Sequence, residues 1–264
     1  MPPTLRDVDV GANLAAARRR IEVAGGDPGS VRIVAVTKGF GPDAVRAALA
    51  CGLRDIGENY AQELLAKARA LADPSSGPRS ADGPVAVGHG GEAGGGAGAG
   101  GGAGAGGGAG AGVEHGVRWH YLGAVQRNKV PALAPVVSLW QSVARAVEGE
   151  AIARRRPGAH VLVEVELTGA PGRNGCPPGQ VGDLVAELRS LPLAVDGLMA
   201  VAPVGPGARA AFRTVRELAD TLGLRERSIG MSDDLEAAVA EGSTMVRLGR
   251  ALFGERPPGR AGAR

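Results

Sequence analysis

The chain has 264 residues and 44% hydrophobic content, enough to bury the core of one large α/β domain or two small ones. Its net charge is only +3, and its arginines are scattered apart from the runs at 18–20 and 154–156, which argues against nucleic-acid binding. No apolar run approaches a membrane span, no secretory signal opens the chain, and Cys51 and Cys176 fit no disulfide or zinc pattern. We expect a cytoplasmic protein without a metal site or membrane anchor.

The first quarter of the chain predicts alternating helices and strands. Val31 to Lys38 (VRIVAVTK) is a continuous apolar run with β-branched residues, which is typical of a buried parallel strand. Pro42 is well placed to open the helix that follows. The elements expected here are a helix at 7–25, a strand at 31–37, a helix at 42–52, a strand at 53–56 and, after the motif GENY, a helix to about 72.

The composition changes sharply after this helix. Residues 74–117 contain 19 of the 45 glycines, with a repeated GGGAGA pattern. Glycine and alanine alone bury too little apolar surface to offset the entropy of ordering. We therefore expect a flexible insertion rather than a P-loop, since no GK[ST] sequence follows the glycines.

The remaining chain returns to strands that alternate with helices. The expected strands are 118–122, 136–140, 160–167, 195–201, 227–229 and 244–248, and the expected helices are 126–133, 144–156, 181–191, 207–223 and 233–241. Ser232 is the expected N-cap of the last of these helices. Eight strands, each followed by a helix, predict a single (β/α)₈ TIM barrel across residues 1–264, interrupted by the insertion. An open doubly wound sheet is the alternative, but GFGP at 39–42 is not its phosphate fingerprint.

Lys38 is the first candidate for chemistry. Only three of the 30 basic residues are lysines, and this one ends the first strand, at the rim where barrels keep their sites. A lysine can lose its proton and form a Schiff base with a carbonyl compound, whereas an arginine cannot. A solvated charge at the end of a strand is the competing explanation, and this stretch alone does not decide between them.

Polar and glycine residues also follow other predicted strands, where a barrel would gather them at one mouth. They are Glu58, Asn59, His120, Gly123, Gln126, Met199, Ser228, Gly230, Ser232, Arg247 and Gly249.

The stretches SIGMSDD (228–234) and VRLG (246–249) resemble a phosphate site, because turn amides at the start of a helix bind anions. A plain turn with an N-cap is the competing explanation. A lysine on the first strand, together with a phosphate site on the last two, suggests pyridoxal 5′-phosphate (PLP) as the cofactor. Arg247 would then face the pyridine nitrogen and leave it largely unprotonated.

The sequence resembles the pyridoxal phosphate homeostasis protein family. The motifs that carry the resemblance run in order along almost the whole chain outside the insertion: VAVTK (34–38), GENYAQE (57–63), WHYLGAVQRNK (119–129), DGLMAV (196–201), SIGMSDDLEAAVAEGSTMVRLG (228–249) and ALFGER (251–256). The resemblance implies a barrel of the alanine-racemase N-terminal type that holds PLP on Lys38. It implies a carrier that buffers PLP or delivers it to apo-enzymes, with no established catalytic turnover, and we expect a monomer.

The same resemblance implies further cofactor contacts, and Gly230 in the glycine turn joins them as an expected cofactor-binding residue. The implied contacts are Asn59, Met199, Ser228, Ser232, Arg247 and Gly249. The chain departs from the family at Arg173, where the family commonly has a lysine, at Arg250, where a small hydroxyl residue is common, and in the length of the insertion.

Three other functions stay open at this point. A PLP-dependent racemase or decarboxylase would need a second acid or base, usually from an added domain, and only 14 residues follow Arg250. An enzyme acting on a phosphorylated metabolite would use carboxylates such as Glu58 or Glu164 as proton carriers. A pure interaction module would rely on the basic tail and the insertion.

Overall fold

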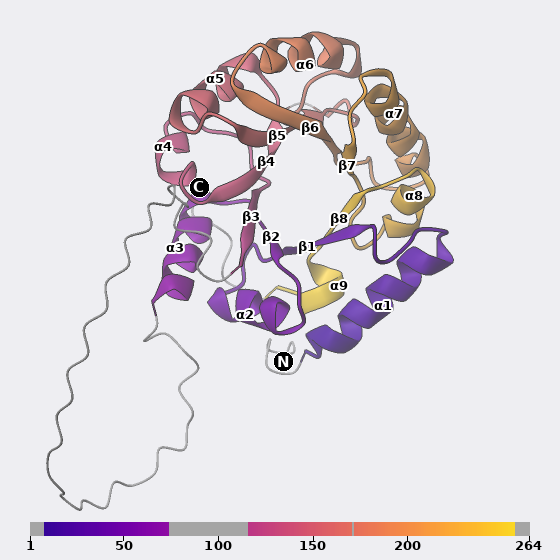
Figure 1. Cartoon of the computed structure of the whole chain (residues 1–264). Helices are drawn as coiled ribbons and strands as arrows, with labels where there is room; N and C mark the ends of the chain where they lie inside the picture. The colour runs from indigo at the N-terminus through magenta and orange to yellow at the C-terminus, as the bar shows by residue number, and fades with distance from the viewer. Residues whose placement is uncertain (1–7, 74–115, 171, 257–264) are drawn as a thin grey trace, which may run out of the picture.

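The computed structural model describes residues 8–73, 116–170 and 172–256. Eight parallel strands form a closed barrel, in which each strand pairs with the next along the chain and β8 pairs with β1 (Figure 1). The strands are β1 (Arg32–Val36), β2 (Asp55–Glu58), β3 (Arg118–Tyr121), β4 (Val137–Val143), β5 (Ala159–Val165), β6 (Leu193–Ala200), β7 (Glu226–Ser228) and β8 (Met245–Leu248). The predicted TIM barrel is confirmed, and the open sheet is wrong.

The helices form a ring outside the strands (Figure 1). They are α1 (Val10–Val23), α2 (Pro42–Ala50), α3 (Ala61–Ala72), α4 (Val130–Leu133), α5 (Ala146–Arg155), the 3-10 turn η3 (Pro178–Gln180), α6 (Val181–Arg189), α7 (Ala208–Thr221), α8 (Leu235–Ala240) and α9 (Arg250–Phe253). Among the described residues, no helix combines the length and apolarity needed to cross a bilayer.

Helix α1 precedes the first strand and completes the ring where the last helices are short. Asp9 caps it by accepting a hydrogen bond from the Ala12 amide at 2.9 Å. Its Asn13 side chain donates to the Leu252 carbonyl of α9 at 3.0 Å, and its Arg20 forms an ion pair with Glu236 of α8. These contacts join the first helix of the barrel to its last two helices.

Apolar side chains fill two separate layers. The larger layer lies between the strands and the helices, and a smaller cluster lies inside the barrel. The inner cluster consists of Val34, Leu139, Leu162, Met199 and Met245. Strands buried on both faces explain the continuous apolar run of β1, and each fully buried aliphatic side chain contributes about 1.5–3 kcal/mol.

Several boundaries differ from the sequence-based expectation. Strand β2 begins two residues later than expected and ends at Glu58. Ser232 is not the N-cap of α8, because the Asp234 carboxylate accepts the Met231 amide at 2.5 Å and the turn delays the helix to Leu235. The insertion expected at 74–117 lies outside the described residues, except for its last two positions.

Candidate functional site

The predicted site residues come from the carboxyl-terminal ends of five strands. Because all strands of the barrel are parallel, these ends meet at one mouth. Lys38 follows β1, Asn59 follows β2, Met199 lies in β6, Ser228 ends β7, Gly230 and Ser232 follow it, Arg247 lies in β8, and Gly249 follows it.

Lys38 presents an amine with no competing partner. Its side chain is half-buried, and no hydrogen bond or ion pair engages its Nζ in the described part of the chain. Burial lowers the pKa of Lys38, and the charges of Arg256 and Arg247 lower it further, against an opposing effect of Glu58. A lowered pKa increases the fraction of neutral, nucleophilic amine at neutral pH.

Lys67 is a second lysine near this mouth, but it is fully engaged. Its ammonium is buried, donates to the Thr37 carbonyl at 2.7 Å, and forms ion pairs with Glu58 and with Glu63, the latter at 3.1 Å. Glu58 also accepts the Asn59 amide at 2.8 Å. This cluster ties together the ends of the neighbouring strands β1 and β2, so Glu58 acts as a structural partner. Lys67 was not predicted as a site residue, although its i,i+4 spacing from Glu63 indicates an ion pair.

Asn59 presents an unusual buried acceptor beside the end of β2. Its Oδ1 atom is buried and has no hydrogen-bond partner among the described residues. A buried acceptor without a donor costs about 1–3 kcal/mol, so this oxygen is a candidate to accept a hydrogen bond from a ligand. Gly123 holds the Asn59 backbone close, because a Cβ at this glycine would lie 1.9 Å from the Asn59 carbonyl oxygen.

Arg247 is a buried cation held by neutral acceptors. Its Nη1 donates to the carbonyl and, at 2.8 Å, to the hydroxyl of Ser228, and its Nη2 donates to the Ala200 carbonyl at 2.8 Å. Burial lowers the pKa of Arg247 to about 10, so the side chain stays charged at neutral pH. No carboxylate forms an ion pair with it among the described residues. Its charge is therefore available to a ligand at the mouth.

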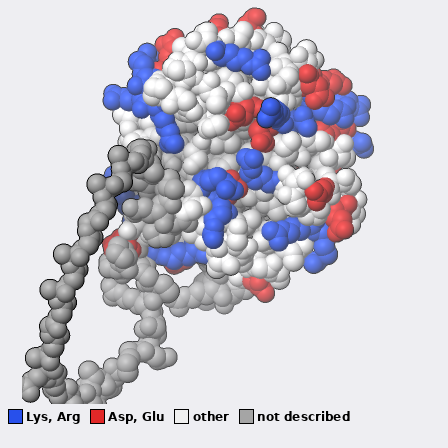
Figure 2. All heavy atoms as spheres, in the orientation of Figure 1, with Lys and Arg blue, Asp and Glu red and all other residues white. Residues whose placement is uncertain are grey.

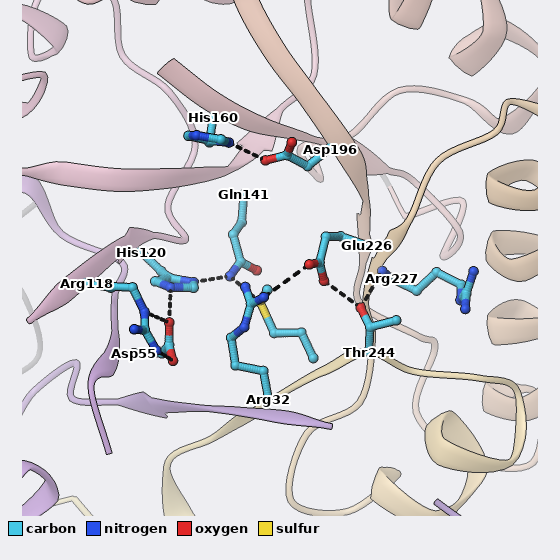
Figure 3. Close-up of polar contacts among 11 residues, drawn as sticks. Arg32, Asp55, Arg118, His120, Gln141, His160, Asp196, Glu226, Arg227 and Thr244 are labelled. Atoms are coloured by element: carbon cyan, nitrogen blue, oxygen red, sulfur yellow. Dashed lines mark hydrogen bonds and ion pairs between the residues drawn. The ribbon is translucent and has the colours of Figure 1, made fainter. Parts of the chain in front are cut away.

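A chain of hydrogen bonds leads away from Arg247 through the barrel interior. The Ser228 hydroxyl donates to Gln141 Oε1 at 2.6 Å, and Gln141 Nε2 lies 2.6 Å from His120 Nδ1. His120 Nε2 lies 3.0 Å from Asp55 Oδ1 (Figure 3).

The protonation states along this chain follow from burial and charge. Burial lowers the pKa of His120, and the contacts with Arg118 and His120 hold the pKa of Asp55 well below its usual range. A neutral imidazole beside an ionised carboxylate carries its proton on Nε2, so Nδ1 accepts from Gln141.

We expected His120 at the carboxyl-terminal mouth, but the structure does not place it there. Its ring points inward and contacts Asp55, the first residue of β2, at the amino-terminal end of the barrel. The position of a residue in its strand does not reveal where a long side chain ends. Gln141 of β4 was also missed, because nothing in its local sequence marks it.

The two expected phosphate loops are tied together. The Ser232 hydroxyl accepts the Ala251 amide at 3.1 Å, and Arg20 donates to the Ser232 carbonyl at 2.9 Å. Within the described residues, no hydrogen bond engages the backbone amides of Ser232, Asp233, Gly249 and Arg250. Free amides grouped at two glycine turns can bind an anion such as phosphate.

Geometry requires a glycine at position 230, and at Gly249 it leaves little room for a side chain. Gly230 has φ +96°, and a Cβ there would lie 2.6 Å from the Ala238 Cβ. A Cβ at Gly249 would lie 3.3 Å from the Val36 carbonyl oxygen. Both turns therefore keep the backbone close to its neighbours.

The structure also places the two residues that depart from the family pattern. Arg173 is exposed, and its neighbour Asn174 donates to Glu164 at 2.5 Å and to the Ser142 carbonyl at 3.2 Å. Burial raises the pKa of Glu164. Arg250 forms an ion pair with Asp233, and its positive charge offsets the negative charge of that residue in the turn at 228–234.

Comparison with known proteins agrees with this arrangement. The family model described as "Alanine racemase, N-terminal domain" matches residues 10–257. A pyridoxal phosphate homeostasis protein of Pseudomonas aeruginosa is 35% identical over 93% of both chains. The protein of the same name from Deinococcus radiodurans is 33% identical, over 93% of this chain and 100% of its own.

Solved structures show the same fold. PipY of Synechococcus elongatus PCC7942 with PLP bound has a TM-score of 0.67 and 27% identity, over 93% of this chain and 100% of its own. A protein from Bifidobacterium adolescentis has a TM-score of 0.72 and 30% identity, over 92% and 94%. An alanine racemase of Clostridium difficile, at 12% identity and a TM-score of 0.58, covers 94% of this chain and 58% of its own and shares the fold alone.

Proposed function

The chain belongs to the pyridoxal phosphate homeostasis protein family, and from this premise we propose that it binds PLP at the carboxyl-terminal mouth of its barrel. The observation that carries the proposal is Lys38, an unpartnered amine whose pKa is lowered by burial. With PLP bound, Lys38 would hold it as a Schiff base on the aldehyde carbon, and the aldehyde oxygen would leave as water.

The other residues of the mouth supply positioning rather than chemistry. The unengaged amides around Ser232 and Gly249 bind the phosphate, and the unpartnered Asn59 amide oxygen accepts from the bound cofactor. Arg247 faces the pyridine nitrogen, and its positive charge disfavours protonation there, which weakens PLP as an electron sink. Met199, a member of the inner apolar cluster, would pack against the cofactor.

A carrier role fits these features better than turnover does. Glu58, one candidate proton carrier, is held by Lys67, and Glu164 is held by Asn174. We propose that the protein buffers PLP and delivers it to apo-enzymes, acting as a monomer in the cytoplasm. The two cysteines, Cys51 and Cys176, are both free, which suits a reducing compartment.

The test is the visible absorption spectrum of the protein with PLP, followed by borohydride reduction and peptide mapping. We expect a Schiff-base band and a reduced pyridoxyl group on Lys38. The Lys38→Ala variant should lose both, whereas Lys129→Ala, the matched control, should keep them. A band that survives Lys38→Ala would overturn the proposal and favour a barrel that binds a phosphorylated metabolite without a Schiff base.

A further inference from the structure

A cavity opens at the amino-terminal end of the barrel, opposite the mouth that carries Lys38. Its volume is about 540 Å³, and its lining includes Arg32, Arg118, Arg225, His120, His160 and Glu226. Figure 2 shows basic and acidic side chains around the hollow at the centre of this face, and Figure 3 shows their contacts. We propose that this cavity binds a small organic anion through a carboxylate or phosphate group.

The carboxylates of the cavity are already satisfied. Asp55 accepts from Arg118 at 2.6 and 2.8 Å and from His120 at 3.0 Å. Glu226 accepts from Arg32 at 3.1 Å and from the Thr244 hydroxyl at 2.7 Å. The third acid, Asp196, lies 2.7 Å from His160 Nδ1. Each acid therefore has a partner from the wall of the cavity itself.

The guanidinium groups, in contrast, keep free donors. Counting contacts with described residues only, Arg118 uses Nε and Nη2 on Asp55 and keeps Nη1 free, and Arg32 uses only Nη2. No hydrogen bond or ion pair engages the side chain of Arg225 in the part of the chain that the structure describes. Three arginines with spare N–H groups thus line one cavity, a donor set that matches carboxylate and phosphate oxygens.

The size and lining of the cavity favour an organic ligand over a bare ion. Its volume lies within the usual range for small-molecule sites. Leu139 and Val195 add apolar surface beside the arginines. The inner apolar cluster of the barrel separates this cavity from the mouth that carries Lys38, so the inference does not rest on the proposed function.

Calorimetric titration with succinate and, separately, with inorganic phosphate tests the proposal at constant ionic strength. The protein is titrated both alone and after incubation with PLP, which occupies the other phosphate-binding loops. Arg225→Gln removes an exposed guanidinium that supports no contact in the fold. Arg18→Gln, exposed on α1 and likewise without a contact among the described residues, is the control for charge.

We expect saturable binding of at least one probe, weakened about tenfold or more by Arg225→Gln and unchanged by Arg18→Gln. The probe that binds with the higher affinity identifies the anionic group that the cavity prefers. The proposal is overturned if neither probe binds the wild-type protein, or if Arg225→Gln binds with wild-type affinity. PLP binding is read separately from the absorption spectrum, so failure here leaves the cofactor proposal standing, and the reverse also holds.

Discussion

Arg247 donates a hydrogen bond to the Ser228 hydroxyl at 2.8 Å, and the same hydroxyl donates to Gln141 at 2.6 Å. A hydroxyl has one proton, so Ser228 can serve both partners only in this orientation. The donor-to-acceptor direction then continues along the chain of hydrogen bonds: Gln141 donates to His120, and His120 donates to Asp55. The arginine at the carboxyl-terminal mouth is thereby positioned by contacts that extend to the opposite end of the barrel.

Ser228→Ala should destabilise the protein by about 1–3 kcal/mol, because it leaves Gln141 Oε1 buried without its donor. Urea unfolding measures the change in the free energy of unfolding. Ser190→Ala is the control: its hydroxyl is exposed and bonds only to the Glu187 carbonyl, so the change should stay within about 0.5 kcal/mol. Equal effects of the two substitutions would contradict the importance of the buried chain.

Lys67→Met should destabilise the protein more strongly, by about 3–5 kcal/mol. The substitution keeps an unbranched side chain but leaves the buried Glu58 carboxylate without its cation. Urea unfolding again supplies the measurement. Lys129→Met provides the comparison, since no contact of the Lys129 side chain occurs within the described residues, and its effect should be small. A small effect at Lys67 would show that Glu58 does not depend on the ion pair.

The features that were predicted correctly are those with local signals. The apolar run of β1 predicts a strand buried on both faces, and the alternation of strands with helices predicts the parallel barrel. Once the barrel is known, the order of strands places Lys38, Ser228 and Arg247 at one mouth, because parallel strands end together. The glycine in the stretch SIGMSDD (228–234) predicts the turn at Gly230.

The features that were missed depend on contacts between distant strands. Gln141 lies in β4 with Ser138 and Ser142, and it gains its role only by lying between Ser228 and His120. Lys67 gains its role from Glu58 across a loop. The amino-terminal cavity depends on how arginines at the starts of separate strands converge, and the scattered positions of these arginines along the chain do not indicate it.

The buried His120 should make stability depend on pH. Burial lowers its pKa below the ordinary value of 6.5, so between its folded pKa and about 6.5 the unfolded chain binds a proton that the folded chain does not. The free energy of unfolding should therefore fall as pH drops through this window, by at most about 1.4 kcal/mol per pH unit.

Urea unfolding at pH 5–8 tests this slope in the wild-type protein and in His120→Gln. The variant should lose the contribution of one titrating group, even if it is less stable overall. Asp55, with its pKa lowered, contributes only in more acidic solution, below its ordinary value of 3.8. The exposed His160→Gln substitution controls for the loss of a histidine. Identical slopes for wild type and His120→Gln would show that His120 titrates normally.

Gly230→Ala should damage the phosphate loop more than Gly249→Ala. Alanine at position 230 would have to adopt φ +96° with its Cβ 2.6 Å from Ala238, whereas at 249 the nearest contact is 3.3 Å. We expect a loss of about 1–3 kcal/mol and weaker PLP binding for Gly230→Ala, and smaller changes for Gly249→Ala. Unfolding and PLP titration measure both effects. The reverse order would show that the loop does not need the positive φ.

The rate at which Lys38 reacts with PLP should depend on pH, and the groups around Lys38 should determine the midpoint of that dependence. Only the neutral amine attacks the aldehyde, so the rate of Schiff-base formation should rise with pH through the pKa of Lys38. Burial and the charge of Arg256 both lower that pKa, so the midpoint should lie below the ordinary value of 10.5. Stopped-flow absorbance over a range of pH gives the midpoint.

Arg256→Gln should move this midpoint upward and slow the reaction at pH 7, because removing a nearby positive charge makes protonation of Lys38 easier. Raising the salt concentration should shrink the difference between the two proteins, since Arg256 is exposed and its charge is screened. Arg189→Gln, on α6, removes the same charge far from the mouth and should leave the midpoint unchanged. If Arg256→Gln keeps the wild-type midpoint, the charge of Arg256 does not contribute to the lowered pKa of Lys38.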